Sequence, residues 1–461
     1  MATGLTEALA DFISGLSFTD LPPDVPKIVG MGFADCVGCI IAGRNERAPQ
    51  VLKEVLQSSG KEAALYCSRE RAGAPEAAWI NGTAAHALDY DDANFVLRGH
   101  ISAVLVPAIM AEAERLGASG KKMIVAYAAG YESWGELSRR DLDDYLMKGW
   151  HTTSVFGAVS AAAACASLLG LGKAETSSAL GIAASQSGGL VSNFGSMTKP
   201  FHAGKAAYTG VMSARLAQAG MTASADSLEH PQGFLQAFSP AGRSDRATPV
   251  KAGREWQMLA QGLSIKRFPM CYMGHKAIDA ALSLRDAYGI RPGDILGIDV
   301  ETSQKSATIM KNHRPQNGMD AKFSMEFAMA AAFLSGNVGL AELDDAFVRR
   351  SDISSLMEAV SISPYADGSR PGDRVTVKTR DGRELVSADF SKARGAWGLQ
   401  LTEDELFQKF GDCLASGGYD GNARALFDAL LNLERLDSAA YFGSLGAAGT
   451  EPDFNLTAAH R

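Results

Sequence analysis

The sequence predicts a mostly helical protein in which a large all-helical domain, built from both ends of the chain, carries an inserted smaller α+β domain. Apolar residues recur at helical spacing through roughly the first 260 residues. Alternating apolar residues flanking a turn appear only further along, between residues 295 and 386, and helical patterns resume after residue 402. A chain of 461 residues is long enough for two such domains.

The N-terminal half predicts one helix after another. An amphipathic segment at 4–15 is followed by the motif PPDVP at 22–26, which starts a helix that runs to about residue 42. Proline is tolerated in that first turn because its missing N–H has no helical partner there. Further helical patterns cover residues 48–58, 75–88, 102–116, 119–137, 173–186 and 204–219.

One long uncharged run, residues 152–172, has the length of a membrane span. It consists mostly of alanine, serine and glycine, whose transfer into lipid is only weakly favourable. We therefore expect a buried helix whose small residues let neighbouring helices approach closely. The N-terminal residues MATGLTEALADF lack the basic and apolar regions of a secretion signal. These observations predict a cytoplasmic protein with no membrane partner.

The inserted domain is predicted from strand patterns. ILGIDVET at 295–302 favours a strand, and residues 375–386 favour a β-hairpin around the turn Arg380-Asp381-Gly382. Helical patterns at 320–335 and 341–347 lie between them. A capping box at 402–405 starts the return to helices.

These patterns place the helical domain at 1–265 and 396–461 and the α+β domain at 266–395. A cleft between two domains is the default position for a ligand site.

Composition and motifs exclude several classes of function. The net charge of -8 gives no support to nucleic-acid binding, which needs a basic face. The nucleotide-binding, zinc-protease and serine-hydrolase motifs are absent from the sequence. Cys36 and Cys39 form a C-x-x-C pair, but they lie in an apolar helical pattern with no second pair at zinc spacing, so we expect core packing.

A dense ionisable segment, NGTAAHALDYDDANFVLRGH at 81–100, lies where a predicted helix gives way to a loop. By composition it is a solvated helix end. Further polar segments with histidine or lysine occur at 149–154 (GWHTTS), 193–205 (NFGSMTKPFHAGK) and 264–276 (SIKRFPMCYMGHK). Reactive groups usually sit on loops held by rigid elements, so these four segments are the candidates for a site.

NGTAAHALDYDD, KGWHTTSVFG, LGIAASQSGGL, NFGSMTKPFHAGKAA and IKRFP, in this order, resemble the MmgE/PrpD family. That family includes 2-methylcitrate dehydratase, cis-aconitate decarboxylase and iminodisuccinate epimerase. The resemblance implies a helical domain with an inserted α+β lid and a homodimer. It also implies catalysis without a cofactor, a metal or an iron–sulfur cluster.

Matched by motif, the family's active-site acid corresponds to Asp89, its loop histidine to His100 and its G-W-H histidine to His151. Its T-K-P and I-K-R-F-P lysines correspond to Lys199 and Lys266. We predict Asp89, His100, His151 and Lys199 as catalytic residues.

Removing a proton next to a carboxylate requires cations that stabilise the developing charge and a base that titrates near neutrality. Histidine supplies the base, and His100 and His151 both remain candidates, with Asp89 orienting the ring. Lys199, Lys266 and Arg267 are the predicted carboxylate ligands.

Other residues near the motifs receive weaker predictions. Tyr145 joins the predicted substrate contacts because it lies near a motif. We interpret Asp91 and Asp92 as structural or solvent-facing. The remaining histidines in these segments are interpreted as structural: His86, His202 and His275.

The sequence departs from the family pattern in ways that bear on the reaction. Ile101 replaces the proline that commonly follows the loop histidine, Phe327 aligns with a tyrosine of the decarboxylase, and Cys271 aligns with a lid histidine. These departures favour an epimerase of iminodisuccinate. A lyase acting on a tricarboxylate and a non-catalytic metabolite-binding protein are the alternatives. The expected partner is a small polycarboxylate.

Overall fold

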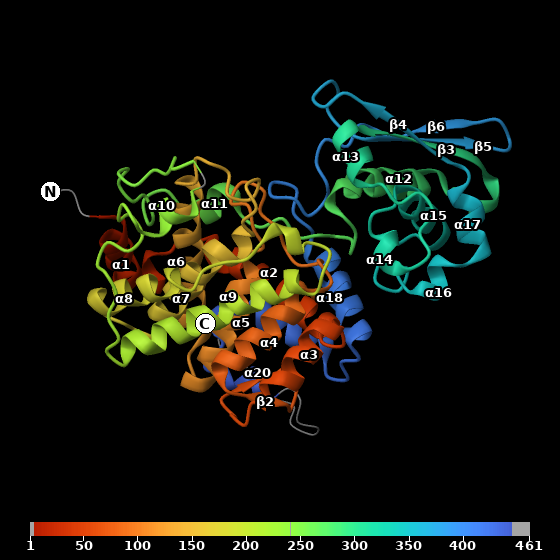
Figure 1. Cartoon of the computed structure of the whole chain (residues 1–461). Helices are drawn as coiled ribbons and strands as arrows, with labels where there is room; N and C mark the ends of the chain where they lie inside the picture. Colours follow the sequence, from red (N-terminus) through yellow and green to blue (C-terminus); the bar gives the residue numbers. More distant parts are fainter. Residues whose placement is uncertain (1–3, 240, 445–461) are drawn as a thin grey trace. The chain divides into compact units, whose positions relative to one another are not determined.

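The computed structural model describes residues 4–239 and 241–444 of the chain. These residues form two compact units, the larger within residues 4–263 and 413–444 and the smaller of residues 264–412 (Figure 1). Helices dominate the secondary structure, which confirms the predicted fold class.

The smaller unit extends past residue 396, where the sequence predicted the return to the helical domain. Arg394 donates its N–H to Asp279 over 2.7 Å and pairs with Glu405, so the segment after residue 395 stays attached to the smaller unit.

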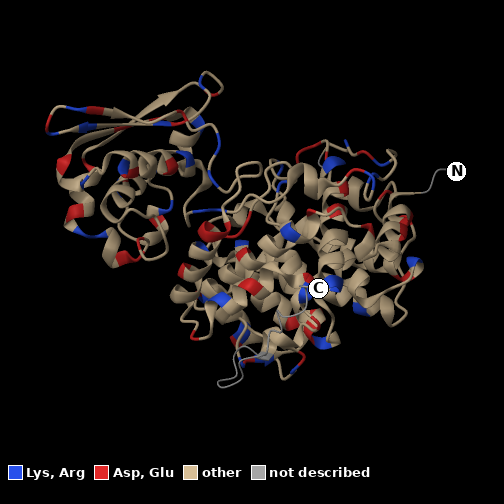
Figure 2. Ribbon diagram, turned by 180° about the vertical axis from the view of Figure 1, so that it is seen from behind, with Lys and Arg blue, Asp and Glu red and all other residues tan. Residues whose placement is uncertain are grey.

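The larger unit is a bundle of helices that follow the predicted segments closely. Most of its helices come from the N-terminal part of the chain: α1 (Leu5–Gly15), α2 (Val25–Gly43), α3 (Arg47–Leu56), α4 (Ala74–Ala87), α5 (Ser102–Leu116), α6 (Gly120–Arg139), α7 (Thr152–Leu169), α8 (Lys173–Ala184) and α9 (Thr198–Gln218). Shorter helices and a two-stranded pair complete it: α10 (Phe234–Phe238), α11 (Gln257–Gln261), α19 (Ala423–Leu431), α20 (Ala440–Ser444), β1 (Ala63–Ala64) and β2 (Arg71–Ala72). The central helices carry few charged side chains (Figure 2).

Small residues allow the central helices to pack closely. A Cβ atom on Gly204 of α9 would lie 2.2 Å from the carbonyl oxygen of Trp79 in α4, so only glycine fits there. Two helices, α2 and α7, are long and apolar enough to cross a membrane by length and composition, but 83% and 89% of their apolar windows are buried within the structure. The uncharged run therefore forms a buried core helix, as predicted.

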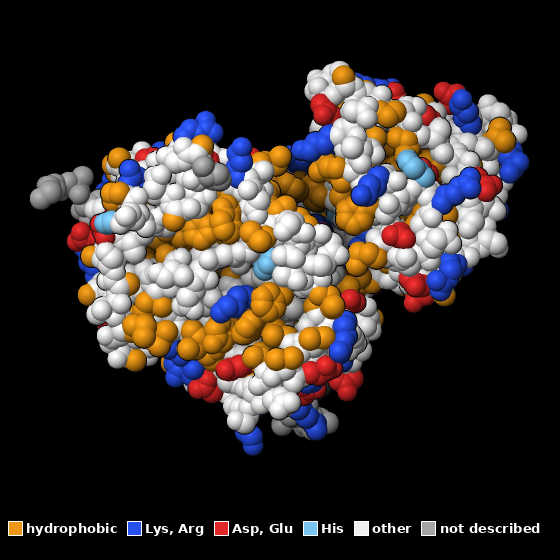
Figure 3. All heavy atoms as spheres, in the orientation of Figure 1, with side chains coloured by type: hydrophobic (Ala, Val, Ile, Leu, Met, Phe, Trp, Pro, Cys, Tyr) orange, Lys and Arg blue, Asp and Glu red, His pale blue; other side chains and the backbone are white. Residues whose placement is uncertain are grey.

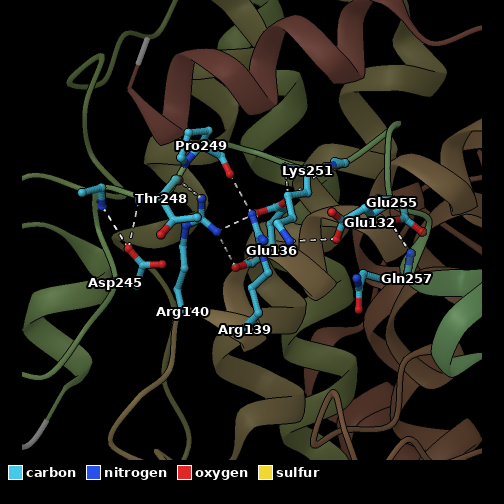
Figure 4. Close-up of polar contacts among 12 residues, drawn as sticks. Glu132, Glu136, Arg139, Arg140, Asp245, Thr248, Pro249, Lys251, Glu255 and Gln257 are labelled. Atoms are coloured by element: carbon cyan, nitrogen blue, oxygen red, sulfur yellow. Dashed lines mark hydrogen bonds and ion pairs between the residues drawn. The ribbon is translucent and has the colours of Figure 1, made fainter. Parts of the chain in front are cut away.

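A buried charge network attaches the chain around residues 245–258 to α6 (Figure 4). Glu136 pairs with Arg140 over 2.6 Å, and its other oxygen accepts the backbone N–H of Lys251 over 2.6 Å. Glu132 accepts the N–H groups of Gln257 and Met258, each over 2.9 Å. Because these carboxylates satisfy backbone donors that would otherwise be buried without partners, the network fixes an irregular segment against a rigid helix.

The smaller unit contains a four-stranded sheet with the order β4-β3-β5-β6. Its strands are β3 (Ile295–Ser303), β4 (Val360–Tyr365), β5 (Arg374–Thr379) and β6 (Glu384–Val386). The antiparallel β5–β6 pair confirms the predicted hairpin. Strand β4, which runs parallel to β3, was not predicted, because its alternation of apolar and polar residues covers only residues 360–363 before Pro364 ends it.

The smaller unit also contains the helices α12 (His275–Tyr288), α13 (Gln304–Ile309), α14 (Gly318–Ala321), α15 (Met325–Ser335), α16 (Asp345–Val348) and α17 (Ser351–Met357). Helix α18 (Glu403–Gly417) crosses the boundary between the two units, which falls after Asp412. The predicted helix at 320–335 is interrupted, because the side chain of Ser324 accepts the N–H of Phe327 and starts α15 anew. The capping box that opens α18 is present, with Thr402 and Glu405 bonded reciprocally.

Candidate active site

Four histidines of the larger unit form a cluster. His86 lies on α4, His100 precedes α5, His151 caps the start of α7 and His202 lies on α9. The ring centroids of His86 and His100 are 4.4 Å apart, those of His86 and His151 are 6.0 Å apart, and those of His151 and His202 are 5.3 Å apart. The fold thus brings His100 and His151, which were predicted as catalytic, together with His86 and His202, which were interpreted as structural.

Asp89 and Lys199 form an ion pair beside this cluster. Asp89 follows the end of α4 with a φ of 54°, a left-handed conformation that aspartate tolerates better than most residues. Nζ of Lys199 lies 2.9 Å from its Oδ1 atom and over the ring of Phe194. Lys199 belongs to the first turn of α9 rather than to a glycine-rich loop, so a helix fixes its direction.

Asp91 is fully buried between two histidines, so of the two interpretations, structural or solvent-facing, the second is wrong. Both of its carboxylate oxygens lie 3.0 Å from Nδ1 of His86. Nδ1 of His100 lies 3.0 Å from Oδ2, although the ring is not aligned for a full hydrogen bond. Burial by itself raises the pKa of Asp91, but the two facing rings more than offset this and hold the pKa well below its ordinary value.

Asp92 differs from its neighbour although it is just as buried. It accepts hydrogen bonds from the backbone N–H and the hydroxyl of Ser102. Burial, followed by the nearby carboxyls of Asp35 and Asp91, raises its pKa well above the ordinary value. Its two bonds to Ser102 anchor the start of α5.

Hydrogen bonds and one close contact fix the loop that carries His100. The side-chain oxygen of Asn94 accepts the N–H groups of Val96 and Leu97, and the indole N–H of Trp134 donates to the carbonyl of Leu97 over 3.0 Å. A Cβ atom on Gly99 would lie 2.3 Å from the Trp134 ring. The loop can approach Trp134 this closely only because residue 99 is glycine.

His151 and His202 share a contact through their Nδ1 atoms, which lie 3.1 Å apart, so one ring donates a proton and the other accepts it. Burial lowers the pKa of both rings, and for His151 the nearby His86 and Lys199 lower it further. His151 is therefore neutral at physiological pH. Its Nε2 atom is the ring nitrogen left for other contacts.

A pocket of about 170 Å³ lies against this cluster. Its polar lining includes His100, His151 and Lys199, and its apolar lining includes Phe95, Leu146 and Phe194. The remaining lining residues are Ala93, Asn94, Arg98, Gly99, Thr152 and Thr153.

Two helices begin at the pocket, because the first residues of α7 and Lys199 in the first turn of α9 line it. Helix α5 begins two residues after His100, and the N–H of Ser102 at its start donates to Asp92 instead. A helix N-terminus carries a partial positive charge, so α7 and α9 favour an anionic ligand. Lys199 adds a full positive charge at the same place.

Tyr145, a predicted substrate contact, is not at this pocket. It is fully buried, and its hydroxyl donates to the carbonyl of Leu235 over 2.7 Å. The backbone carbonyl of Leu235 therefore accepts the hydrogen bond that the hydroxyl was expected to donate to a ligand. Proximity to a motif in sequence did not place this side chain at the site.

Lys266 and Arg267 belong to the smaller unit. Lys266 is buried, and Arg267 pairs with Asp279 over 3.0 Å. Arg267 also lines a pocket of about 280 Å³ within that unit, together with Lys392 and Arg394. Their role as carboxylate ligands stays a prediction.

The carboxylates of the cluster also have the spacing of metal ligands. Ligand atoms of His86, Asp89, Asp91 and His100 lie within 4.8 Å of one another, and this donor set suits a divalent cation. In the structure Lys199 neutralises Asp89, while Asp91 accepts the proton of His86. A cation would have to displace both an ammonium group and a bonded imidazole proton.

Two family models match the chain. The MmgE/PrpD N-terminal domain covers residues 7–246, and the MmgE/PrpD C-terminal domain covers residues 268–434.

Curated relatives align over nearly the whole chain at 25% identity. A cis-aconitate decarboxylase of Homo sapiens covers 98% of this chain and 96% of its own length. The cis-aconitate decarboxylase of Aspergillus terreus covers 94% of each, and that of Mus musculus covers 89% of this chain and 86% of its own length.

Proposed function

This chain belongs to the MmgE/PrpD family, and we propose on that premise that it is a lyase that acts on a short polycarboxylate. The observation that carries the proposal is the convergence of the N-termini of α7 and α9, with Lys199, on one small pocket. Such a site stabilises negative charge, and a pocket of about 170 Å³ suits a small metabolite. The named relatives are decarboxylases of a tricarboxylate, which supports the same ligand class.

The chemistry requires a site for a developing carbanion. When carbon dioxide leaves a carbon next to a double bond, the electron pair of the broken bond spreads over the allylic carbons and an adjacent carboxylate. The ammonium of Lys199 and the N–H groups at the start of α7 oppose that charge in a pocket with apolar walls. A neighbouring acid then protonates the carbanion, which completes the exchange of carbon dioxide for a proton.

His100 and His151 are the groups that we assign to proton transfer. Both line the pocket, so each is within reach of a bound ligand. His151, which burial keeps neutral, can donate or accept a proton according to the state of its contact with His202. His100 lies beside the ion pair of Asp89 and Lys199, with its Nε2 atom 3.9 Å from Oδ1 of Asp89.

A second candidate is an epimerase of iminodisuccinate, and the environment of Phe327 favours it. The resemblance places a tyrosine of the decarboxylase at this position. Here the phenyl ring is fully buried in the core of the smaller unit, against Phe347, and offers no hydroxyl. Proton exchange at the α-carbon needs the same carboxylate ligands and proton carriers but breaks no C–C bond.

Proton NMR in deuterium oxide distinguishes the candidates. The purified protein is incubated separately with cis-aconitate, 2-methylcitrate and the stereoisomers of iminodisuccinate. We expect one of the first two to be converted to a new alkene. Deuterium entering at the α-carbon of iminodisuccinate, with stereoisomers interconverting and no alkene formed, would replace the lyase by the epimerase. No reaction with any of the three would refute the proposed function.

Matched variants test the assignment of residues. His151→Ala and Lys199→Ala should abolish most of the turnover, because each removes a side chain that lines the pocket. Lys205→Ala is the control, since this lysine lies on the same helix as Lys199 but packs its ammonium over the ring of Tyr208, 4.3 Å from its centroid. Equal losses in Lys199→Ala and Lys205→Ala would contradict the assignment of Lys199.

A further inference from the structure

Asp91 occupies an unusual position for a carboxylate. It is fully buried, and its oxygens lie 3.0 Å from Nδ1 of His86 and 3.0 Å from Nδ1 of His100. A buried carboxylate is stable as an anion only when donors surround it. Two imidazole N–H groups supply those donors, provided that both rings carry their proton on Nδ1.

His86 fits this arrangement as a neutral ring. Burial lowers the pKa of His86 to about 4, although Asp91 opposes the shift. Its Nε2 atom is buried and has no hydrogen-bond partner among the residues that the structure describes. A proton on a buried Nε2 atom without an acceptor would be an unsatisfied donor, which costs free energy. The single proton of His86 therefore lies on Nδ1, facing Asp91.

His100 has the same relation to Asp91, but its other nitrogen faces the site. Nε2 of His100 lies 3.9 Å from Oδ1 of Asp89, which is too long for a hydrogen bond. A protonated Nε2 would be drawn toward that carboxylate, whereas a lone pair is repelled by it. Lys199 bonds the same oxygen over 2.9 Å in its place.

We propose that Asp91 is a positioning residue that accepts the Nδ1 protons of His86 and His100 together, so that Nε2 of His100 is the basic nitrogen of the site. A small rotation of the His100 ring aligns its N–H with Oδ2. The catalytic part of this inference rests on the proposed function, whereas the tautomers do not depend on the substrate. Asp91 touches no ligand in the pocket and acts through His100.

The substitution Asp91→Asn tests the proposal because an amide cannot serve both rings. Its oxygen can accept a proton from one imidazole, but its NH₂ group must donate to the other, whose proton then moves to Nε2. His100 is the ring that changes, because a proton on the buried Nε2 of His86 would have no acceptor in the described part of the chain. Nε2 of His100 can then no longer take up a proton and pass it to the substrate carbanion, so kcat falls by on the order of 10³ to 10⁴, as when a serine protease histidine is held in the wrong tautomer. KM should change much less, because Lys199 and the helix N-termini are untouched.

Asp92→Asn is the matched control. The neighbouring acid is equally buried but bonds Ser102 instead of a histidine. An amide of the same shape can still accept the N–H of Ser102 and donate to its hydroxyl, so kcat should stay within about threefold of the wild type. A loss as large in Asp92→Asn as in Asp91→Asn would show that any change in this loop disrupts the site, and it would overturn the proposal.

The spectroscopic readout is long-range ¹H–¹⁵N NMR of the full chain labelled only at its eight histidines. His86→Gln and His100→Gln identify the two signals by their disappearance. The wild type should show both rings as Nδ1–H tautomers, and Asp91→Asn should convert one of them. A wild-type His100 protonated on Nε2 overturns the proposal even if the Asp91 variant does not fold.

The two proposals fail separately. If the tautomers are as expected but no polycarboxylate reacts, the proposed function is wrong and the role of Asp91 in fixing the rings stands. If a polycarboxylate reacts and Asp91→Asn keeps kcat within twofold of the wild type, the role of Asp91 is wrong and the proposed function stands.

Discussion

Replacing Gly204 with alanine tests whether the close contact of α4 and α9 is what assembles the site. Helix α4 carries His86 and leads into Asp89, while α9 carries Lys199 and His202. At the crossing point, a Cβ atom on residue 204 would lie 2.2 Å from the carbonyl oxygen of Trp79. A backbone oxygen cannot move aside as a flexible side chain can, so the two helices must separate.

The loss of unfolding free energy in Gly204→Ala is the difference between two opposing contributions. Alanine stabilises a helix by about 1 kcal/mol relative to glycine. Overpacking of a tight interior costs about 1 to 3 kcal/mol, and a clash with backbone falls at the upper end of that range. The net loss is therefore about 2 kcal/mol. With an unfolding entropy of about 2.1 cal/mol/K per residue over a unit of roughly 300 residues, Tm should fall by about 3 °C.

Activity should fall as well, because the separation moves Lys199 away from Asp89. A displacement approaching 1 Å at a catalytic group costs on the order of 10² in rate. The assays are scanning calorimetry and kcat/KM for the polycarboxylate that reacts. Gly411→Ala in α18 is the control, since nothing lies within 4 Å of its Cβ position and alanine should stabilise that helix. A Gly204→Ala protein as stable as Gly411→Ala would refute the reasoning.

Three further predictions concern single residues. Lys199→Gln should raise KM about 10- to 100-fold, because a charge-assisted hydrogen bond is lost. The unfolding free energy should fall by under about 1 kcal/mol, because the partner of Lys199, Asp89, is partly exposed. An unchanged KM would contradict this prediction. Glu136→Ala should lower the unfolding free energy measured in urea by about 3 to 5 kcal/mol, because it leaves Arg140 buried without its charge partner. The control Glu255→Ala breaks an exposed pair and should lower it by under about 1 kcal/mol. Similar losses in both variants would refute the distinction. Burial lowers the pKa of His275 to about 3, so its folded form stays neutral while the unfolded chain takes up a proton below pH 6.5. The wild type should therefore lose stability relative to His275→Gln as pH falls from 6.5 to 4, by at most about 1.4 kcal/mol per pH unit, and a difference that is constant with pH would exclude this linkage.

The sequence predicted the helices of the larger unit because their apolar residues repeat at helical spacing over long segments. Local chemistry also predicted the hairpin at 374–386 and the capping box at Thr402, since turn residues and caps act over a few positions. It did not predict β4, whose alternating pattern is short and which is held by its pairing with the distant β3. Long-range pairing has no local signal.

The residues of the candidate site were likewise predicted only in part from the sequence. Motifs selected His100, His151 and Lys199, and these residues do line one pocket. Asp91 was interpreted as structural or solvent-facing, because three acids in four residues usually lie on the surface and nothing in the sequence indicates which of them the fold buries. Tyr145 was selected for its neighbourhood in sequence, and the fold turned its hydroxyl toward Leu235 instead.

By itself the sequence determined the fold class, the order of the helices and the residue types available for chemistry, since these depend on periodicity and composition. Only the tertiary structure decided that His86 and His202, which lie on different helices, join His100 and His151 in one cluster. Only the fold brings the N-termini of α7 and α9 to the same pocket. The physical reason is that protonation state and charge stabilisation depend on burial and on partners distant in sequence, and packing alone fixes both.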